Sequence, residues 1–168
     1  MRLLFLDFDG VLHPTDAIHH REHDSGSTRI TGDRLFRHAP QLYALLEDHL
    51  DVAVVISSDW RLSQPLEDLR ERLGALGGRV VGTTSYTALP GMAEYSLEVS
   101  GLTRYRQCER LANHFGVDDW RLIDDHVEIV FGPERATPEM MRRVVFCDPI
   151  MGLDTWITVG RLEKWLVD

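Results

Sequence analysis

The chain has 168 residues, of which 43% are hydrophobic and 27% charged, and its formal net charge is −9. This size and composition predict one globular domain over residues 1–168 with a core of its own. The negative charge excludes broad, non-specific nucleic-acid binding, which depends on many Lys and Arg contacts to phosphate, although a few arginines could still recognise a strand end.

The first predicted element is a buried strand over residues 3–6, and two carboxylates follow it directly. Four apolar residues are about right for a strand and too few for a membrane span. Asp7 and Asp9 then come where the strand leaves the core, and Gly10 allows a sharp turn behind them. Two carboxylates at this position repel each other unless a cation or a shared proton neutralises them, so they are candidate site residues.

Strands and helices then alternate along the chain. Continuous apolar runs predict further strands, and apolar stripes at helical spacing predict the helices between them. This order indicates βαβ units and a three-layer αβα sandwich with a central, mostly parallel, Rossmann-like sheet. The predicted strands are 52–56, 79–81, 120–123 and 144–147; the predicted helices are 42–50, 66–76, 108–115 and a last one from an N-cap at Asp154 to about residue 166.

Two segments do not follow this alternation. Residues 13–33 are polar and are predicted to form a flap over the site, while 82–103 is predicted to be irregular. Neither insertion is long enough for a full cap domain, so the site is expected to be open. A zinc site on His19, His20 and His23 is the weaker alternative for the flap, because no cysteine or carboxylate lies at ligand spacing.

The two cysteines and the opening residues bear on the compartment. Cys108 and Cys147 lie in apolar surroundings, which is typical of reduced core thiols. The opening apolar stretch meets Asp7 at once and lacks a small-residue cleavage site, so it does not resemble a signal peptide. We therefore expect a cytoplasmic protein with no membrane partner.

Three predicted strands end in polar residues. The first ends in Asp7 and Asp9, the second in 57–59 (Ser-Ser-Asp), and the strand 120–123 in Asp124 and Asp125. In a parallel sheet these ends share one edge, so the side chains converge there. Carboxylates so placed would bind a hard cation such as Mg²⁺, which in turn would hold a phosphate.

These motifs resemble those of the haloacid dehalogenase (HAD) superfamily. The first is Asp7-Phe8-Asp9-Gly10-Val11, the second is Val54-Val55-Ile56-Ser57, and the fourth is Leu122-Ile123-Asp124-Asp125. Within the superfamily the chain is most similar to the HAD domain associated with Swiss-Army-knife RNA-repair proteins. That likeness lies in residues 6–13, in Ile56-Ser57-Ser58 with Trp60-Arg61, and in Asp148-Pro149 with Gly152-Leu153, whereas Asp59 departs from the small polar residue expected there.

The resemblance implies a Mg²⁺-dependent phosphomonoester hydrolase. Asp7 would be the nucleophile that forms an aspartyl-phosphate, and Asp9 the general acid and base. Mg²⁺ would be held by Asp7, the Asp9 backbone carbonyl and one or both of Asp124 and Asp125. Ser57 would contact the phosphoryl group, and the predicted substrate-binding residues are Gly10, Ser58, Trp60 and Arg61.

The third motif departs from the family, which places a lysine ahead of a helix. The only lysine is Lys164, so Arg104 or Arg106 must take this place. Arg104 lies four residues before Cys108 and shares the inward stripe of the helix, so it is the predicted residue.

Several alternatives stay open at this point. A calcium loop is disfavoured by Val11 and Leu12 at ligand positions, and a sugar-nucleotide DxD site by the short chain. The role of Ser57 could be merely to cap the following helix. Trp60 could be a tryptophan packed beneath the sheet edge, and Arg61 an exposed arginine. The preferred substrate is a nucleotide or polynucleotide terminal phosphate, of undetermined 3′ or 5′ polarity. The alternatives are a small-metabolite phosphatase or a non-catalytic binding module; the oligomeric state is not predicted.

Overall fold

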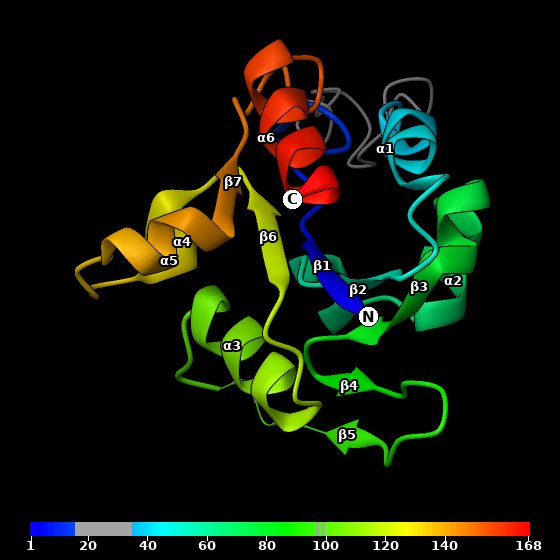
Figure 1. Ribbon diagram of the computed structural model, residues 1–168, viewed down its shortest axis with the longest axis vertical. Helices are drawn as coiled ribbons and strands as arrows, with labels where there is room; N and C mark the ends of the chain where they lie inside the picture. The colour runs from blue at the N-terminus through cyan, green and yellow to red at the C-terminus, as the bar shows by residue number, and fades with distance from the viewer. Residues whose placement is uncertain (16–34, 97, 99) are drawn as a thin grey trace, which may run out of the picture.

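A seven-stranded sheet forms the centre of the protein. The computed structural model describes residues 1–15, 35–96, 98 and 100–168, and the strand order is β5-β4-β3-β2-β1-β6-β7 (Figure 1). The neighbours from β3 to β7 pair in parallel, and β4 and β5 add an antiparallel edge. The predicted mostly parallel sheet is confirmed. The strands are β1 (Arg2–Leu6), β2 (Val52–Ile56), β3 (Val80–Thr83), β4 (Tyr86–Thr87), β5 (Tyr95–Ser96), β6 (Trp120–Asp124) and β7 (Val144–Phe146).

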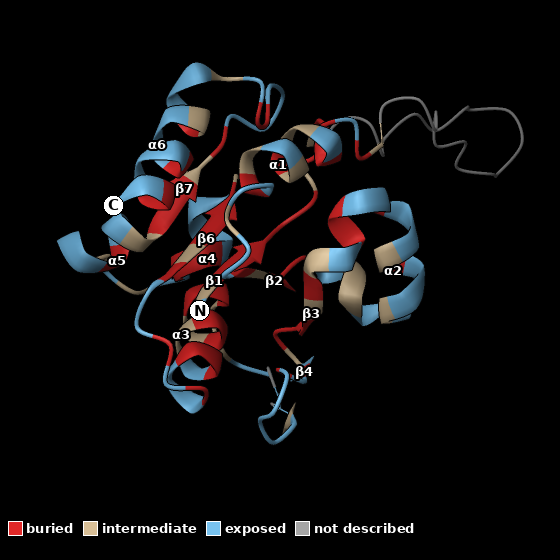
Figure 2. Cartoon of the chain, turned by 45° about the vertical axis from the view of Figure 1, so that its right-hand side comes forward, coloured by how far each residue is buried: buried red, intermediate tan, exposed pale blue. Residues whose placement is uncertain are grey.

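Helices cover both faces of the sheet. Apolar residues of α1, α2 and α6 pack in one cluster, and those of α3, α4 and α5 pack in the other. In Figure 2 the strands are buried between helices whose outer faces are exposed. The α-helices are α1 (Ala39–Leu46), α2 (Leu66–Arg72), α3 (Arg104–His114), α4 (Val127–Phe131), α5 (Pro138–Arg143) and α6 (Trp156–Val167); two 3₁₀ segments are η2 (Asp59–Leu62) and η3 (Gly74–Arg79).

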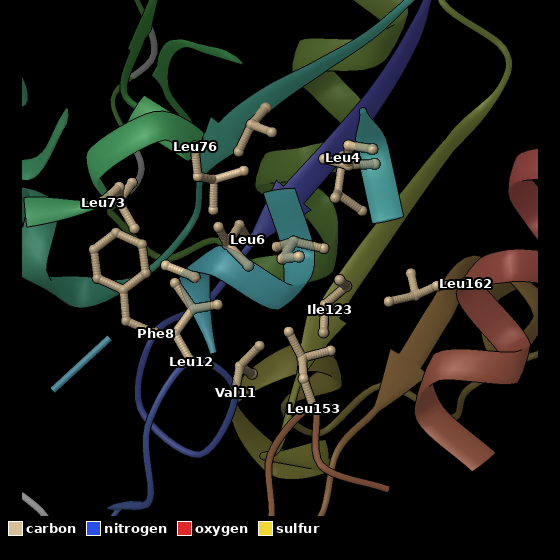
Figure 3. Packing of buried hydrophobic residues seen from close by; sticks show 14 of the residues in the cluster. Leu4, Leu6, Phe8, Val11, Leu12, Leu73, Leu76, Ile123, Leu153 and Leu162 are labelled. Carbon is tan, nitrogen blue, oxygen red and sulfur yellow. The ribbon is translucent and has the colours of Figure 1, made fainter. Parts of the chain in front are cut away.

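The central strand β1 explains why its sequence is apolar without alternation. Leu4 and Leu6 point into the cluster beneath α1, α2 and α6, while Leu3 and Phe5 point into the opposite one. Figure 3 shows Leu4 and Leu6 gathered with Ile123 of β6 and Leu162 of α6. Both faces are therefore buried, as expected for a parallel strand between two helical layers.

Some predicted bounds differ from the observed ones. The stripe over 66–76 predicts one helix, but α2 ends at Arg72 and the chain continues as η3. Gly74 has a φ of +58°, a left-handed conformation that ends a helix and that glycine adopts without strain. The predicted strand 79–81 begins one residue later and extends to Thr83, and 144–147 ends at Phe146.

Other elements were not predicted. The stretch 82–103, expected to be irregular, contains β4 and β5, and the short helices α4 and α5 follow β6. Two-residue strands are too short to show a period of two, and α4 exposes Val127 and Ile129, so its apolar pattern is not confined to one face.

The predicted flap lies mostly outside the described residues, which include only 13–15 of it, and His19, His20 and His23 lie outside them as well. Cys108 and Cys147 are buried and not disulfide-bonded. Within the described part of the chain, no helix has the length and apolar character needed to cross a membrane.

The N-cap of α6 is Thr155 and not the predicted Asp154. The Thr155 hydroxyl accepts a hydrogen bond from the Thr158 backbone N–H and lies 2.7 Å from the Thr158 hydroxyl, while Asp154 is exposed one residue earlier. We expect Thr155→Ala to lower the free energy of unfolding by about 1 kcal/mol and Asp154→Ala to change it by less than about 0.5 kcal/mol, measured by urea denaturation. A larger loss for Asp154→Ala would contradict this assignment.

Candidate active site

Three strand ends bring the predicted residues to one edge of the sheet. In the register of the sheet, Leu6 of β1 lies opposite Ile56 of β2 and Ile123 of β6. The residues that follow, Asp7, Ser57 and Asp124, therefore share one level at the carboxyl edge. The parallel topology thus brings together side chains that are far apart in the sequence.

Three carboxylates form a compact group at this edge. One oxygen of each of Asp7, Asp124 and Asp125 lies within 4.8 Å of the others. Asp7 and Asp124 are buried and Asp125 is partly exposed. A cluster of carboxylate oxygens with one side open is the donor set that a hard divalent cation prefers, so the residues fit Mg²⁺.

Arg104, the first residue of α3, reaches into this group. Its Nη1 lies 3.0 Å from Asp7 Oδ2 and 2.6 Å from Asp124 Oδ2, and its Nη2 lies 3.2 Å from Asp59 Oδ1. The Thr103 side chain caps the helix by accepting a hydrogen bond from the Arg106 backbone N–H, so the helix begins at Arg104. Arg106 instead pairs with Glu109 and Glu134, away from the carboxylates. The structure thus brings Arg104, and not Arg106, to the clustered carboxylates, and the role of Arg104 as the third-motif residue stays a prediction.

Burial raises the pKa values of the clustered carboxyl groups. It is the main cause that raises the pKa of Asp7 to about 7; the charge of Asp124 adds to it, and the guanidinium of Arg104 opposes it. Burial also raises the pKa of Asp124, against the opposing charge of Arg104. The pKa of Asp125 is raised by burial and by Asp124. One guanidinium does not balance three carboxylates, so the group has room for further positive charge.

Gly10 has a structural reason for being glycine. Its φ is +68°, and a Cβ at this position would overlap the Asp125 carboxylate. Gly10 therefore gives the Asp125 side chain its place beside Asp7. The predicted contact of Gly10 with substrate stays a prediction.

The carboxyl group of Asp9 is not one of the three clustered carboxylates and has hydrogen-bond partners of its own. Its Oδ1 lies 2.9 Å from His13 Nε2, and its Oδ2 accepts the Trp60 indole N–H at 3.0 Å. Trp60 packs edge-on against Phe8 and Phe36. The predicted Asp9 ligand was its backbone carbonyl, and that assignment stays a prediction.

The second-motif serines lie beneath the same edge. Ser57 and Ser58 are fully buried, and the Ser57 hydroxyl has no hydrogen-bond partner among the residues that the structure describes. Buried hydroxyl groups normally have a partner, so this donor is suited to a group that enters the site.

Arg61 holds the second-motif loop in place. Its Nη1 donates to the carbonyl oxygens of Ser57 and Ser58 at 2.6 and 2.7 Å, and its Nη2 donates to Gln107 Oε1 at 2.9 Å. Only 3% of the side chain is exposed. The alternative of an exposed arginine is wrong, because the guanidinium is buried against these carbonyl oxygens. The predicted contact of Arg61 with substrate stays a prediction.

Sequence reasoning missed three residues beside the site. His13 contacts Asp9, Thr15 Oγ1 lies 3.3 Å from Asp125 Oδ2, and Gln107 links Arg61 to the Thr84 hydroxyl. Only His13 left a signal, because it follows Asp9 by four residues in the turn after β1. Thr15 and Gln107 reach the site through tertiary contacts alone.

One of three comparisons with known proteins identifies the family of this chain. The family model for the HAD domain in Swiss Army Knife RNA repair proteins matches residues 3–155. The chain belongs to this family. The matched range contains every clustered carboxylate together with Ser57 and Arg104, and the chain is a HAD-type hydrolase domain. Comparisons with curated proteins and with solved structures gave no match.

Proposed function

We propose that this HAD domain hydrolyses phosphate monoesters through an aspartyl-phosphate on Asp7. The observation that carries the proposal is the contact of the buried Asp7 carboxylate with Arg104, with Asp124 and Asp125 beside it. A buried carboxylate that an arginine side chain holds in place at the end of a strand is positioned to act as a nucleophile. The family places its nucleophile at this point of its first motif, and Asp7 occupies it.

The two halves of the reaction use Asp7 and Asp9. An Asp7 oxygen attacks phosphorus, the bond from phosphorus to the ester oxygen breaks, and the Asp9 carboxyl group gives its proton to that oxygen. A water molecule then attacks phosphorus and gives a proton to Asp9, while the Asp7–phosphorus bond breaks. Inorganic phosphate leaves, and both side chains return to their starting states.

Other side chains stabilise charge on the phosphoryl group. The Ser57 hydroxyl, which lacks a partner among the described residues, would donate to a phosphoryl oxygen. Arg104 keeps Asp7 in place and reduces its repulsion from a phosphate dianion. Mg²⁺, held by Asp7, Asp124 and Asp125, would neutralise phosphate charge when bound.

The preferred substrate is a nucleotide or the terminal phosphate of a polynucleotide. The family is named for a domain of RNA repair proteins, which supports a nucleic-acid end. The net charge of −9 favours recognition of one end over binding along a strand. A small-metabolite phosphatase and a binding module without catalysis are the alternatives that the experiment separates.

The test is phosphate release in the presence of Mg²⁺ from mononucleotides, from 3′- and 5′-phosphorylated oligonucleotides and from an aryl phosphate. We expect the wild type to prefer one nucleotide or oligonucleotide, and Asp7→Asn to lose activity by a factor on the order of 10³ or more. Asp48→Asn, which changes an exposed aspartate outside the site, is the matched control.

Three results would contradict the proposal in different ways. Activity on the aryl phosphate alone would favour a small-metabolite phosphatase. Full activity in Asp7→Asn would exclude Asp7 as the nucleophile. No release from any substrate by folded wild-type protein would favour the binding module.

A further inference from the structure

The carboxyl group of Asp9 has one hydrogen-bond donor on each oxygen. His13 Nε2 lies 2.9 Å from Oδ1, and Trp60 Nε1 lies 3.0 Å from Oδ2. Two donors in fixed places restrict rotation of the carboxyl group about its last bond. The Asp9 side chain is still 31% exposed, so the group remains open to a reactant.

The His13 ring is held in one tautomer. The Phe36 backbone N–H donates to His13 Nδ1 at 3.3 Å, so Nδ1 is the acceptor and Nε2 carries the hydrogen that is donated to Asp9. His13 is fully buried, which shields both hydrogen bonds from water. The direction of the bond to Asp9 therefore follows from the backbone of Phe36.

Aromatic packing fixes both donors. The Phe36 ring lies 5.1 Å from the His13 ring and 5.3 Å from the Trp60 ring, each in an edge-on arrangement. Phe36 has a φ of +54°, a left-handed conformation that is costly for a bulky residue. Such strain persists where the surrounding structure determines the conformation, and it is common beside functional sites.

We propose that His13 and Trp60 are positioning residues that orient the Asp9 carboxyl group for proton transfer. The inference rests on the proposed phosphatase function, in which Asp9 protonates the leaving oxygen. It adds two residues that act through Asp9 and do not touch the phosphate. Neither His13 nor Trp60 binds the proton that Asp9 transfers to the leaving oxygen. Each oxygen of Asp9 has a further lone pair beside its hydrogen bond, and that lone pair binds the transferred proton.

This role predicts a dependence on the leaving group. An alkoxide needs a proton as its bond to phosphorus breaks, whereas 4-nitrophenolate is a stable anion and leaves without one. The ratio kcat/KM reports the steps up to this bond cleavage. Loss of Asp9 orientation should therefore reduce kcat/KM for an alkyl phosphate more than for 4-nitrophenyl phosphate.

The experiment compares Trp60→Phe with Trp165→Phe. Both variants lose an indole donor to an aspartate, because Trp165 donates to Asp119 at 2.7 Å. Asp119 lies just before β6, at the opposite end of that strand from Asp124. We expect Trp60→Phe to lower kcat/KM about tenfold to a hundredfold for the alkyl ester and less than about threefold for the aryl ester. Trp165→Phe should change neither value.

His13 gives a second, independent pair of variants. His13→Leu removes the donor, and His13→Gln keeps an N–H at similar reach, so glutamine should recover much of the alkyl phosphatase activity that leucine loses. This pair decides the question if Trp60→Phe does not fold, as checked by circular dichroism.

Equal losses on the two esters would show a merely structural role and overturn the inference, as would no loss in either variant. These results leave the proposed function standing, because the wild type is active in them. A folded wild type inactive on both esters and on every nucleotide and oligonucleotide tested would instead overturn the proposed function and the inference with it.

Discussion

Replacing Arg104 with methionine is expected to destabilise the fold by about 3 to 5 kcal/mol and to abolish phosphatase activity. The reason is that Arg104 is the cation within reach of two buried carboxylates, Asp7 and Asp124, at 3.0 and 2.6 Å. Methionine would leave both without this partner, and removing one member of a buried ionic group is costly. The free energy of unfolding from urea denaturation and kcat for the preferred ester measure the two effects.

Arg106→Met is the matched control for Arg104→Met. Arg106 lies two residues further along the same helix and forms partly exposed ion pairs with Glu109 and Glu134. Such pairs contribute little, so we expect a change of less than about 1 kcal/mol and unaltered activity. A similar loss in both variants would contradict the assignment of Arg104 to the third motif.

Arg104→Lys tests whether the family's usual lysine can replace the arginine. The two terminal nitrogens of the guanidinium, Nη1 and Nη2, contact three carboxylates, including that of Asp59 at 3.2 Å. One ammonium group cannot match this forked geometry, so we expect an intermediate loss of stability and activity. Activity equal to that of the wild type would show that only the charge matters.

The second large effect concerns pH. In the absence of divalent cations, the wild type should lose stability relative to Asp7→Asn as the pH rises from about 4 to about 7. The pKa of Asp7 is raised from its ordinary value of 3.8 to about 7 in the folded protein, mainly by burial. Between these values the folded state holds a proton that the unfolded state has released. Raising the pH through this interval therefore lowers the free energy of unfolding.

The size of this effect has an upper bound. At 1.36 kcal/mol per pKa unit, the shift from 3.8 to about 7 corresponds to at most about 4 kcal/mol above pH 7. Asparagine has no charge to bury, so Asp7→Asn should lack the part of the pH dependence that comes from Asp7, whereas the raised pKa values of Asp124 and Asp125 act in both proteins. Thermal unfolding across the pH range, with Asp48→Asn as the control for an exposed carboxylate, measures the difference.

Mg²⁺ should reverse the loss of stability of the wild type relative to Asp7→Asn at neutral pH. A cation held by Asp7, Asp124 and Asp125 stabilises the folded state by mass action, and it favours their charged forms. The wild type should gain more in unfolding temperature from Mg²⁺ at pH 7.5 than at pH 5, and Asp7→Asn should gain less at both. If the difference in unfolding temperature between the wild type and Asp7→Asn does not vary with pH, the pKa of Asp7 is not raised.

The layers of the fold and the elements that carry the site can be predicted from the amino-acid sequence alone. Continuous apolar runs predict strands buried on both faces, and β1 meets this condition with Leu4 and Phe5 in opposite clusters. Carboxylates at the ends of two such runs predict a shared edge, because parallel strands align their carboxyl ends. The choice of Arg104 over Arg106 follows from helical periodicity in the same way.

The contacts within the site, in contrast, depend on how the elements pack in three dimensions. The buried guanidinium of Arg61 holds the carbonyl oxygens of Ser57 and Ser58, and Gly10 makes room for the Asp125 carboxylate, and neither contact can be deduced from the sequence. The hydrogen bonds from His13 and Trp60 to Asp9 depend on the packing of Phe36. Periodicity reports which face a residue occupies, whereas its partner depends on loops and packed rings brought together by the fold.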